Sequence, residues 1–192
     1  MILTIASQEL SATSDLADSM AAAIARRRAR AGRNVLLIYK TTVATDGWLA
    51  TAIKSGAETR EIPAMNIANE LVSAKMEYHD IVISMPQLED AGSLYALATA
   101  ELAVFAIQAD QWRSDRNLIS SIHAARTRNP ELPVLLLIDN LQGTAGRAIM
   151  AALSAQIANV RFLHLSAKKR DETSVGALYQ AIYAHCAAAC QA

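Results

Sequence analysis

The feature that most constrains this chain is a repeated alternation of short, uniformly apolar segments with longer amphipathic ones. Pro133–Ile138 (PVLLLI) is apolar at every position, which is typical of a strand buried on both faces. The first long segment instead places Leu16, Met20, Ala23 and Ile24 at the spacing of one helical face. The alternation predicts an α/β fold, with a doubly wound, mostly parallel sheet of about seven strands and helices on both faces.

The same pattern gives approximate boundaries for the elements. Strands are expected at Ile2–Ala6, Asn34–Tyr39, Thr59–Pro63, Asp80–Ser84, Ala103–Ile107, Pro133–Ile138 and Val160–Leu165. Helices are expected from a cap at Ser14 or Asp15 to a stop at Ala31-Gly32, and at Trp48–Lys54, Asn66–Met76, Ser93–Leu102, Gln111–Arg126, Thr144–Ile157 and Thr173–Ala189. Because Pro63 cannot donate a ladder hydrogen bond, Thr59–Pro63 is predicted to be an edge strand.

The composition favours one soluble globular domain covering residues 1–192. The chain is 53% hydrophobic and 19% charged and has no formal net charge, which argues against a disordered or generally polyanion-seeking protein. It has neither an apolar run of about 20 residues nor a signal-type N-terminus, so a cytoplasmic location without a membrane span is expected. Near the end of the chain, Cys186 and Cys190 are expected to be reduced thiols, and with His185 they make a poor metal site.

The first strand leads into a turn where α/β nucleotide-binding proteins place a phosphate loop. Such a loop needs glycines, so that backbone N–H groups can approach phosphate, and a lysine that reaches the β and γ groups. The turn from Gln8 to Ser14 (QELSATS) contains neither glycine nor lysine and carries one carboxylate. The sequence therefore predicts the strand–turn–helix scaffold of a phosphate site without the glycines and the lysine that bind phosphate.

Five segments together resemble the ParA/MinD family of deviant-Walker ATPases, particularly its short plasmid-partition members. They are MILTIASQ, AGRNVLLIYKT, YHDIVISMP, LATAELAVFAIQADQW and NPELPVLLLIDN, and they follow the family's order over nearly the whole chain. In the family they correspond to the strand before the KGGVGKT loop, the GKRVLLIDAD stretch, the YDxVIIDTP strand, the AADLVLIPVxP segment and the strand before the adenine-contacting loop. The resemblance implies a P-loop NTPase-like sandwich.

The chain departs from this family at the catalytic positions. By the resemblance, Glu9 stands at the signature lysine, Ser14 near the P-loop lysine and Asp15 near the Mg²⁺-binding hydroxyl. Tyr39 replaces the aspartate that orients water, and Ser84 replaces the aspartate of the Mg²⁺ shell. Phosphoryl transfer depends on positioning and charge neutralisation by these groups, so we expect ATP binding and hydrolysis to be lost and no cofactor to be bound.

Two other catalytic patterns are weaker. The segment Leu135–Asp139 (LLLID) resembles a Walker B strand, but it comes too late in the chain and is predicted to be a core strand. The residues Ser84, Asp139 and His164 follow the chain order of an α/β-hydrolase triad. The flanks of Ser84 cannot form a nucleophile elbow, and His164 is predicted to be structural.

Two basic clusters are candidates for DNA binding. The first comprises Arg26, Arg27, Arg28, Arg30 and Arg33, and the second comprises Lys168, Lys169 and Arg170. Family members bind DNA through basic residues that lie largely elsewhere, and cations at a helix C-terminus also have a purely structural explanation. Both interpretations of the arginines therefore stay open.

The aromatic residues Trp48, Tyr95 and Trp112 follow strand ends or lie on helices near the degenerate site, where either a partner surface or core packing explains them. The resemblance implies a role in positioning a plasmid, a chromosome or cell-envelope machinery, and the departures at the catalytic positions predict a catalytically inactive scaffold or regulator. Its expected protein partner is a second copy, an active paralogue or a cargo adaptor. The alternatives are an accessory non-specific DNA-binding protein and an enzyme with a rebuilt strand-end pocket.

Overall fold

The computed structural model describes residues 1–7, 16–39, 52–63, 66–85, 91–109, 112, 116–139, 143–165 and 172–189. The strands are β1 (Ile2–Ser7), β2 (Val35–Tyr39), β3 (Glu58–Glu61), β4 (Asp80–Met85), β5 (Leu102–Gln108), β6 (Val134–Asp139) and β7 (Val160–Leu165). The helices are α1 (Leu16–Arg30), α3 (Ile67–Glu77), α4 (Ala91–Thr99), α5 (Arg116–Arg128), α6 (Thr144–Gln156) and α7 (Glu172–Ala189).

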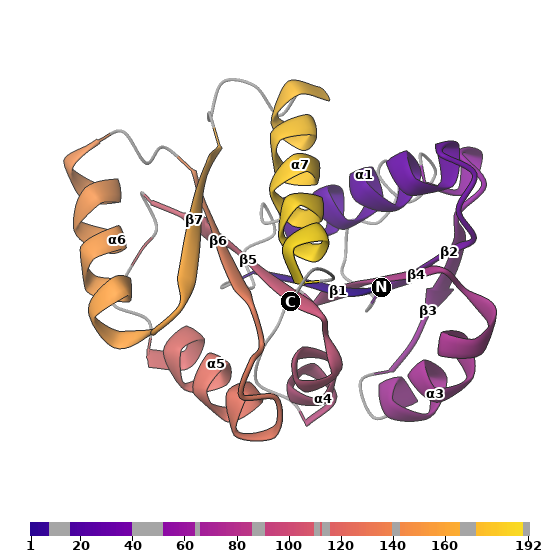
Figure 1. The fold of residues 1–192 in the computed structure, drawn as a ribbon, viewed down its shortest axis with the longest axis horizontal. Coiled ribbons are helices and arrows are strands. Elements are labelled where there is room, and N and C mark those ends of the chain that lie inside the picture. The colour runs from indigo at the N-terminus through magenta and orange to yellow at the C-terminus, as the bar shows by residue number, and fades with distance from the viewer. Residues whose placement is uncertain are drawn as a thin grey trace.

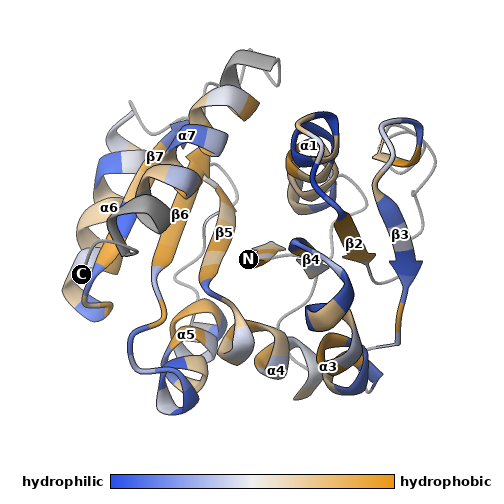
Figure 2. Cartoon of the chain, turned by 45° about the vertical axis from the view of Figure 1, so that its right-hand side comes forward, coloured by the Kyte–Doolittle hydropathy of each residue, from blue (hydrophilic) through white to orange (hydrophobic). Residues whose placement is uncertain are grey.

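Seven strands of the described chain form one parallel sheet in the order β3-β2-β4-β1-β5-β6-β7. This confirms the predicted α/β fold and its doubly wound sheet. The position of β3 at one edge confirms the predicted edge strand, although β3 is Glu58–Glu61 and ends before Pro63. Figure 2 shows β3 as hydrophilic, whereas β5 and β6 in the interior of the sheet are strongly hydrophobic.

Helices cover both faces of the sheet, and each face has its own core. Helices α3, α4, α5 and α6 pack on one face around Phe105, Ile83 and Leu136. On the other face α1 and α7 pack against Leu37, Val82 and neighbouring strand residues (Figure 1). The alternation of side chains along each strand divides the core into these two halves.

Two helix boundaries differ from the prediction. The Ser93–Leu102 helix is instead Ala91–Thr99, and Leu102 begins β5. The reason is that the N–H of Glu101 donates to the carbonyl of Ile2 at 2.9 Å, which joins the chain to β1 before Leu102. The predicted Gln111–Arg126 helix is wrong at its start, because Trp112 is described and is not helical; α5 is Arg116–Arg128 and so continues two residues further than predicted.

The first helix agrees only in part with its predicted apolar face. Met20 and Ile24 are buried as expected, but Ala23 is half-buried and Ala21 lies in the core instead. The helix ends at the predicted Ala31-Gly32 stop. Of the Trp48–Lys54 helix, the described part covers residues 52–54, which are helical.

At the edge of the sheet where the parallel strands begin, the Arg126 side chain donates hydrogen bonds to the segments that precede β6 and β7. Arg126 donates to the carbonyl of Leu132 from Nε and Nη2, at 3.3 and 3.2 Å, beside the start of β6. It also donates to the carbonyls of Ala158 and Asn159, at 2.6 and 3.2 Å, directly before β7. The strand-start edge is thus built from specific side chain to backbone contacts.

Candidate functional site

Ligands of doubly wound sheets bind beyond the carboxyl ends of the strands, where neighbouring strands lead to opposite faces. Here α1 follows β1 and packs on one face, whereas α4 follows the adjacent β4 and packs on the other (Figure 1). The candidate site is therefore the edge of the sheet at which β1, β2 and β4 end.

The structure brings together two of the predicted nucleotide-site positions. Tyr39 is the last residue of β2 and lies directly beside Ser84 in the β2–β4 register. Burial, and to a lesser extent the charge of Glu61, raise the pKa of the Tyr39 phenol, so this side chain stays neutral. The other three positions, Glu9, Ser14 and Asp15, lie outside the described residues.

A carboxylate that the sequence analysis did not single out lies beside Ser84. Asp18, in the first turn of α1, is 2% exposed and accepts a hydrogen bond from the fully buried Ser84 Oγ. The sequence did contain a signal for this contact, because Asp18 lies in line with Ala21 and Ala25 on the buried stripe of the helix. An acidic residue on such a stripe needs a partner in the core.

The structure does not bring together Ser84, Asp139 and His164, the residues with the chain order of a hydrolase triad. Strands β1 and β5 lie between Ser84 on β4 and Asp139 on β6. Three strand spacings separate these residues by about 14 Å, far beyond hydrogen-bond reach. His164 lies on β7, one strand further, and is half-buried.

At the opposite edge of the sheet, Asp80 at the start of β4 is fully buried within a cluster of cations. Arg28 donates to both of its oxygens, from Nε at 2.8 Å and from Nη2 at 3.3 Å. Arg33 Nε also donates to Asp80, at 3.3 Å, and the Met1 ammonium lies 3.8 Å away. Two of the five predicted DNA-binding arginines therefore hold this buried carboxylate.

The turn after α1 explains why both arginines reach one carboxylate. Gly32 has a φ of +79°, and its N–H donates to the carbonyl of Ala29 while that of Arg33 donates to Arg28. This pair of hydrogen bonds is a Schellman motif, which brings the residue after the glycine back onto the last turn of the helix. Arg33 consequently lies next to Arg28.

Arg28 also joins α1 to α7. Its Nη1 donates to the hydroxyl of Tyr179 at 3.3 Å, and its guanidinium lies 4.3 Å from the ring centroid of Tyr183. Burial lowers the pKa of Arg28, but the hydrogen bonds with Asp80 and Tyr179 raise it, and the net shift is upward. Arg28 is thus a permanently charged link between β4, α1 and α7.

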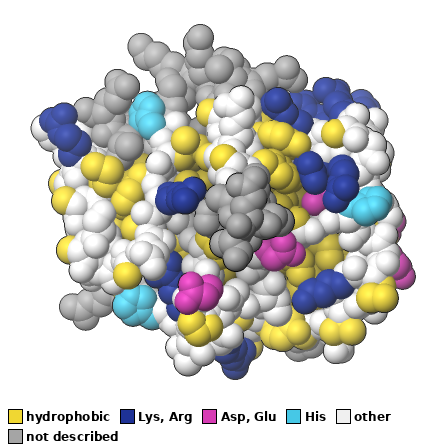
Figure 3. All heavy atoms as spheres, in the orientation of Figure 1, with side chains coloured by type: hydrophobic (Ala, Val, Ile, Leu, Met, Phe, Trp, Pro, Cys, Tyr) yellow, Lys and Arg dark blue, Asp and Glu magenta, His cyan; other side chains and the backbone are white. Residues whose placement is uncertain are grey.

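The remaining arginines of the first cluster face a hollow between α1 and α7. This hollow has a volume of about 250 Å³, and the described residues that line it are Ala23, Arg26, Arg27, Arg30 and Val175. In Figure 3 basic side chains gather at the upper right, over α1. The second basic cluster, Lys168, Lys169 and Arg170, lies outside the described residues.

The predicted partner residues are only partly surface residues. Tyr95 and Trp112 are half-buried and pack against the core on the α3–α6 face. Trp48 lies outside the described residues. Core packing therefore explains part of the buried area of Tyr95 and Trp112.

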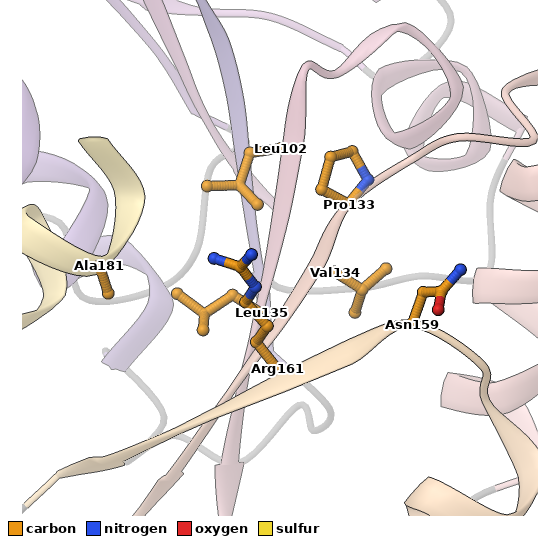
Figure 4. Close-up of a pocket in the computed structure, with 7 residues that line it drawn as sticks. All are labelled: Leu102, Pro133, Val134, Leu135, Asn159, Arg161 and Ala181. Carbon is orange, nitrogen blue, oxygen red and sulfur yellow. The ribbon is translucent and has the colours of Figure 1, made fainter. Parts of the chain in front are cut away.

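A second hollow lies near the starts of β5, β6 and β7. It is lined by Leu102, Pro133, Val134, Leu135, Asn159, Arg161 and Ala181. Figure 4 shows the Arg161 side chain reaching between Leu102 and Leu135. Its volume of about 30 Å³ corresponds to roughly one water molecule. It is a packing gap and not a ligand site.

Within the described ranges, no three His, Cys, Asp or Glu side chains come close enough together to hold a metal ion. The described helices also include none that is long and apolar enough to cross a bilayer.

The fold can be compared with solved structures. A cobyrinic acid a,c-diamide synthase from Mycobacterium smegmatis, with bound ATP analogue and magnesium, aligns over 96% of each chain with a TM-score of 0.66 and 14% identity. A plasmid partition protein from Borrelia burgdorferi aligns over 96% of this chain and all of its own, with a TM-score of 0.60 and 14% identity. MinD from Aquifex aeolicus aligns over 92% of this chain and 87% of its own, with a TM-score of 0.57 and 14% identity.

This chain has a ParA/MinD-like P-loop NTPase fold. That conclusion confirms the structural part of the resemblance drawn from the five sequence segments. No family model and no curated protein matches the sequence. At 14% identity the structural likeness establishes the fold and leaves the chemistry to be argued from the residues of this chain.

Proposed function

We propose that this protein is a pseudo-ATPase: a ParA/MinD-like domain that neither binds nor hydrolyses ATP and acts as a scaffold or regulator in positioning a cellular cargo. The observation that carries the proposal is the hydrogen bond between Ser84 and Asp18. By the resemblance, the end of β4 is where the family places an aspartate of the magnesium shell. Here that position holds a hydroxyl, which donates to a carboxylate on α1.

The described residues at the ends of β2 and β4 support the proposal, because Tyr39 and Ser84 provide no carboxylate for magnesium. Magnesium is held by carboxylates and phosphates with open positions for water. Tyr39 and Ser84 offer a neutral phenol and a hydroxyl, and the Asp18 carboxylate is almost completely buried.

Isothermal titration calorimetry with ATP, with magnesium and with a chelator, tests the loss of nucleotide binding. We expect no magnesium-dependent saturable binding; any magnesium-independent heat that is lost in Arg27→Ala belongs to the arginines of α1 and not to the strand-end site. Because a structural neighbour was solved with an ATP analogue and magnesium, retained binding is the specific alternative. Tight magnesium-dependent binding that Ser84→Ala weakens would overturn the proposal.

The scaffold role requires a protein partner. A neighbouring structure is a MinC:MinD cell division protein complex, which supports the expectation that a domain of this shape binds other proteins. Light scattering across micromolar concentrations tests self-association, and capture with a mixed extract tests other partners. A monomer that captures no specific partner would count against the scaffold role.

Non-specific DNA binding remains the alternative function. Since Arg28 and Arg33 hold Asp80, this alternative rests on Arg27 and Arg30, which line the hollow on α1. A duplex mobility shift that weakens with salt and is lost in an Arg27→Ala/Arg30→Ala variant would favour this alternative.

A further inference from the structure

The hollow between α1 and α7 has the residues of an anion site. Arginines provide three of its five described lining residues, whereas Ala23 and Val175 provide an apolar floor. Arg27 and Arg30 are three residues apart, so they project from the same side of α1. The concentration of guanidinium groups around a small concave volume distinguishes this place from an ordinary solvated helix face.

Helix α7 holds one of these guanidiniums in place. The Arg27 guanidinium lies 4.7 Å from the ring centroid of Tyr179. Its Nη1 is also 3.5 Å from the position that a Cβ on Gly176 would occupy, which is an ordinary van der Waals distance and places the guanidinium against α7. A guanidinium stacked on a ring keeps its N–H donors free to point outward in its own plane.

Arg28 forms an ion pair with Asp80, but the arginines of the hollow differ from it in this respect. Among the described residues, no carboxylate lies within ion-pair distance of Arg27 or Arg30, whereas Arg28 contacts Asp80 directly. Arg26 takes part in another interaction, so we count it only as a lining residue. Arg27 and Arg30 therefore place two positive charges on one face of α1 without a carboxylate partner among the described residues.

We propose that this hollow binds the phosphate group of a small anionic ligand. Guanidinium forks match the oxygens of phosphate in paired hydrogen bonds. A phosphate dianion balances the charges of Arg27 and Arg30 together. The volume of about 250 Å³ falls below the range of about 300–1,000 Å³ typical of drug-sized ligands, which favours a compact molecule. This proposal does not depend on the state of the nucleotide site, because the hollow lies between two helices on one face.

Calorimetric titration with inorganic pyrophosphate tests the proposal. We expect saturable binding that weakens by about tenfold or more in Arg27→Ala and in Arg30→Ala, because each variant removes one guanidinium fork. Arg30→Lys keeps the charge but loses the fork, so it should bind with intermediate affinity. Arg147→Ala on α6 removes an exposed arginine far from the hollow and is the matched control.

A second variant tests the site from α7. Gly176→Glu places a carboxylate beside Arg27, where it should pair with the guanidinium and weaken pyrophosphate binding, whereas Gly176→Gln should weaken it less. Circular dichroism checks that each variant folds. Absence of saturable binding, or equal weakening in Arg147→Ala, would overturn the site. Binding of a DNA duplex without binding of pyrophosphate at the same ionic strength would also overturn it, in favour of a nucleic-acid surface.

Discussion

At one end of the contact between α1 and β4, Asp80 lies between two arginines; at the other end, Asp18 accepts a hydrogen bond from Ser84. Both carboxylates are almost completely buried, and both links join the same helix to the same strand. Asp80 and Ser84 are four residues apart on β4, so their side chains point to the same face, toward α1. Both links thus join α1 to the same face of β4, but one is an ion pair and the other is a hydrogen bond between a hydroxyl and a carboxylate.

The difference separates a structural link from a candidate site. The Asp80 cluster lies where the parallel strands start, and its charge is balanced by cations that the helix and its terminal turn supply. The Asp18–Ser84 pair lies where the strands end, which is the edge at which this architecture binds ligands. Removing the Asp80 carboxylate should therefore lower the free energy of unfolding more than a change at the Asp18–Ser84 pair.

The largest effect is expected for Asp80→Ala. It leaves the mostly buried Arg28 without its carboxylate, and breaking one side of a buried ion pair costs about 3–5 kcal/mol. Urea unfolding measures the loss, and the exposed Glu131→Ala serves as the matched control. The double variant Asp80→Leu/Arg28→Met should lose less than Asp80→Ala alone. A loss no larger than that of the control would contradict a structural role for this link.

The next effect is expected for Ser84→Asp, which restores the aspartate that the resemblance implies. With Asp18 in place, two carboxylates would share one buried position, and we expect a loss of about 2–4 kcal/mol in the free energy of unfolding. The swap Asp18→Ser/Ser84→Asp keeps one carboxylate and one hydroxyl, so it should recover most of that loss. Thermal melts of all three proteins measure this, and a Ser84→Asp protein as stable as the parent would show that the pair is not needed.

A smaller effect is expected at the turn that delivers Arg33 to Asp80. Gly32→Ala forces a side chain into the left-handed region and should cost about 1 kcal/mol. Nothing lies within 4 Å of the added Cβ, so the loss would come from the backbone alone. Gly32→Asn should cost less, because asparagine tolerates this conformation better. Equal stability of the Gly32→Ala and Gly32→Asn proteins in chemical denaturation would refute this account of the turn.

The smallest effect concerns an exposed ion cluster near the same edge. Hydrogen bonds from Tyr78 and Arg60 lower the pKa of Glu58 below its usual value. The stabilisation is therefore complete above the unfolded pKa and is lost as the pH falls through the lower folded pKa. Because Glu58 is half-exposed, Glu58→Gln should cost only a few tenths of a kcal/mol, on the order of 0.5 at neutral pH. The cost should shrink as the pH is lowered below the unfolded pKa of about 4.3. Unfolding across this pH range measures it, and a pH-independent difference would contradict the ionic explanation.

The sequence predicted most of the fold because the strands are so uniformly apolar. Segments such as Val35–Tyr39 and Val134–Asp139 leave little choice besides buried parallel strands. The end of α4 was harder to place, because Ala/Leu-rich sequence suits a helix as well as a strand. There the long-range hydrogen bond of Glu101 to Ile2 decides the boundary, and no local pattern records it.

The polar links could not be predicted in the same way. Asp18 and Ser84 are 66 residues apart in the sequence, and Arg28 and Asp80 are 52 apart, so each pair forms only once the sheet brings α1 onto β4. The sequence shows the arginines as a cluster, but which of them contact Asp80 depends on the packing of α1 against β4 and, for Arg33, on the turn at Gly32. The positions Glu9, Ser14, Asp15, Trp48 and Lys168–Arg170 remain predictions.

Helix α1 is about 22 Å long, and a polar contact joins each of its ends to β4: Asp18 to Ser84 and Arg28 to Asp80. Its first turn carries Asp18 and its last turns carry Arg27, Arg28 and Arg30. Because Asp18 and these arginines belong to one helix, any sliding or rotation of α1 would move the Asp18–Ser84 pair and the basic hollow together.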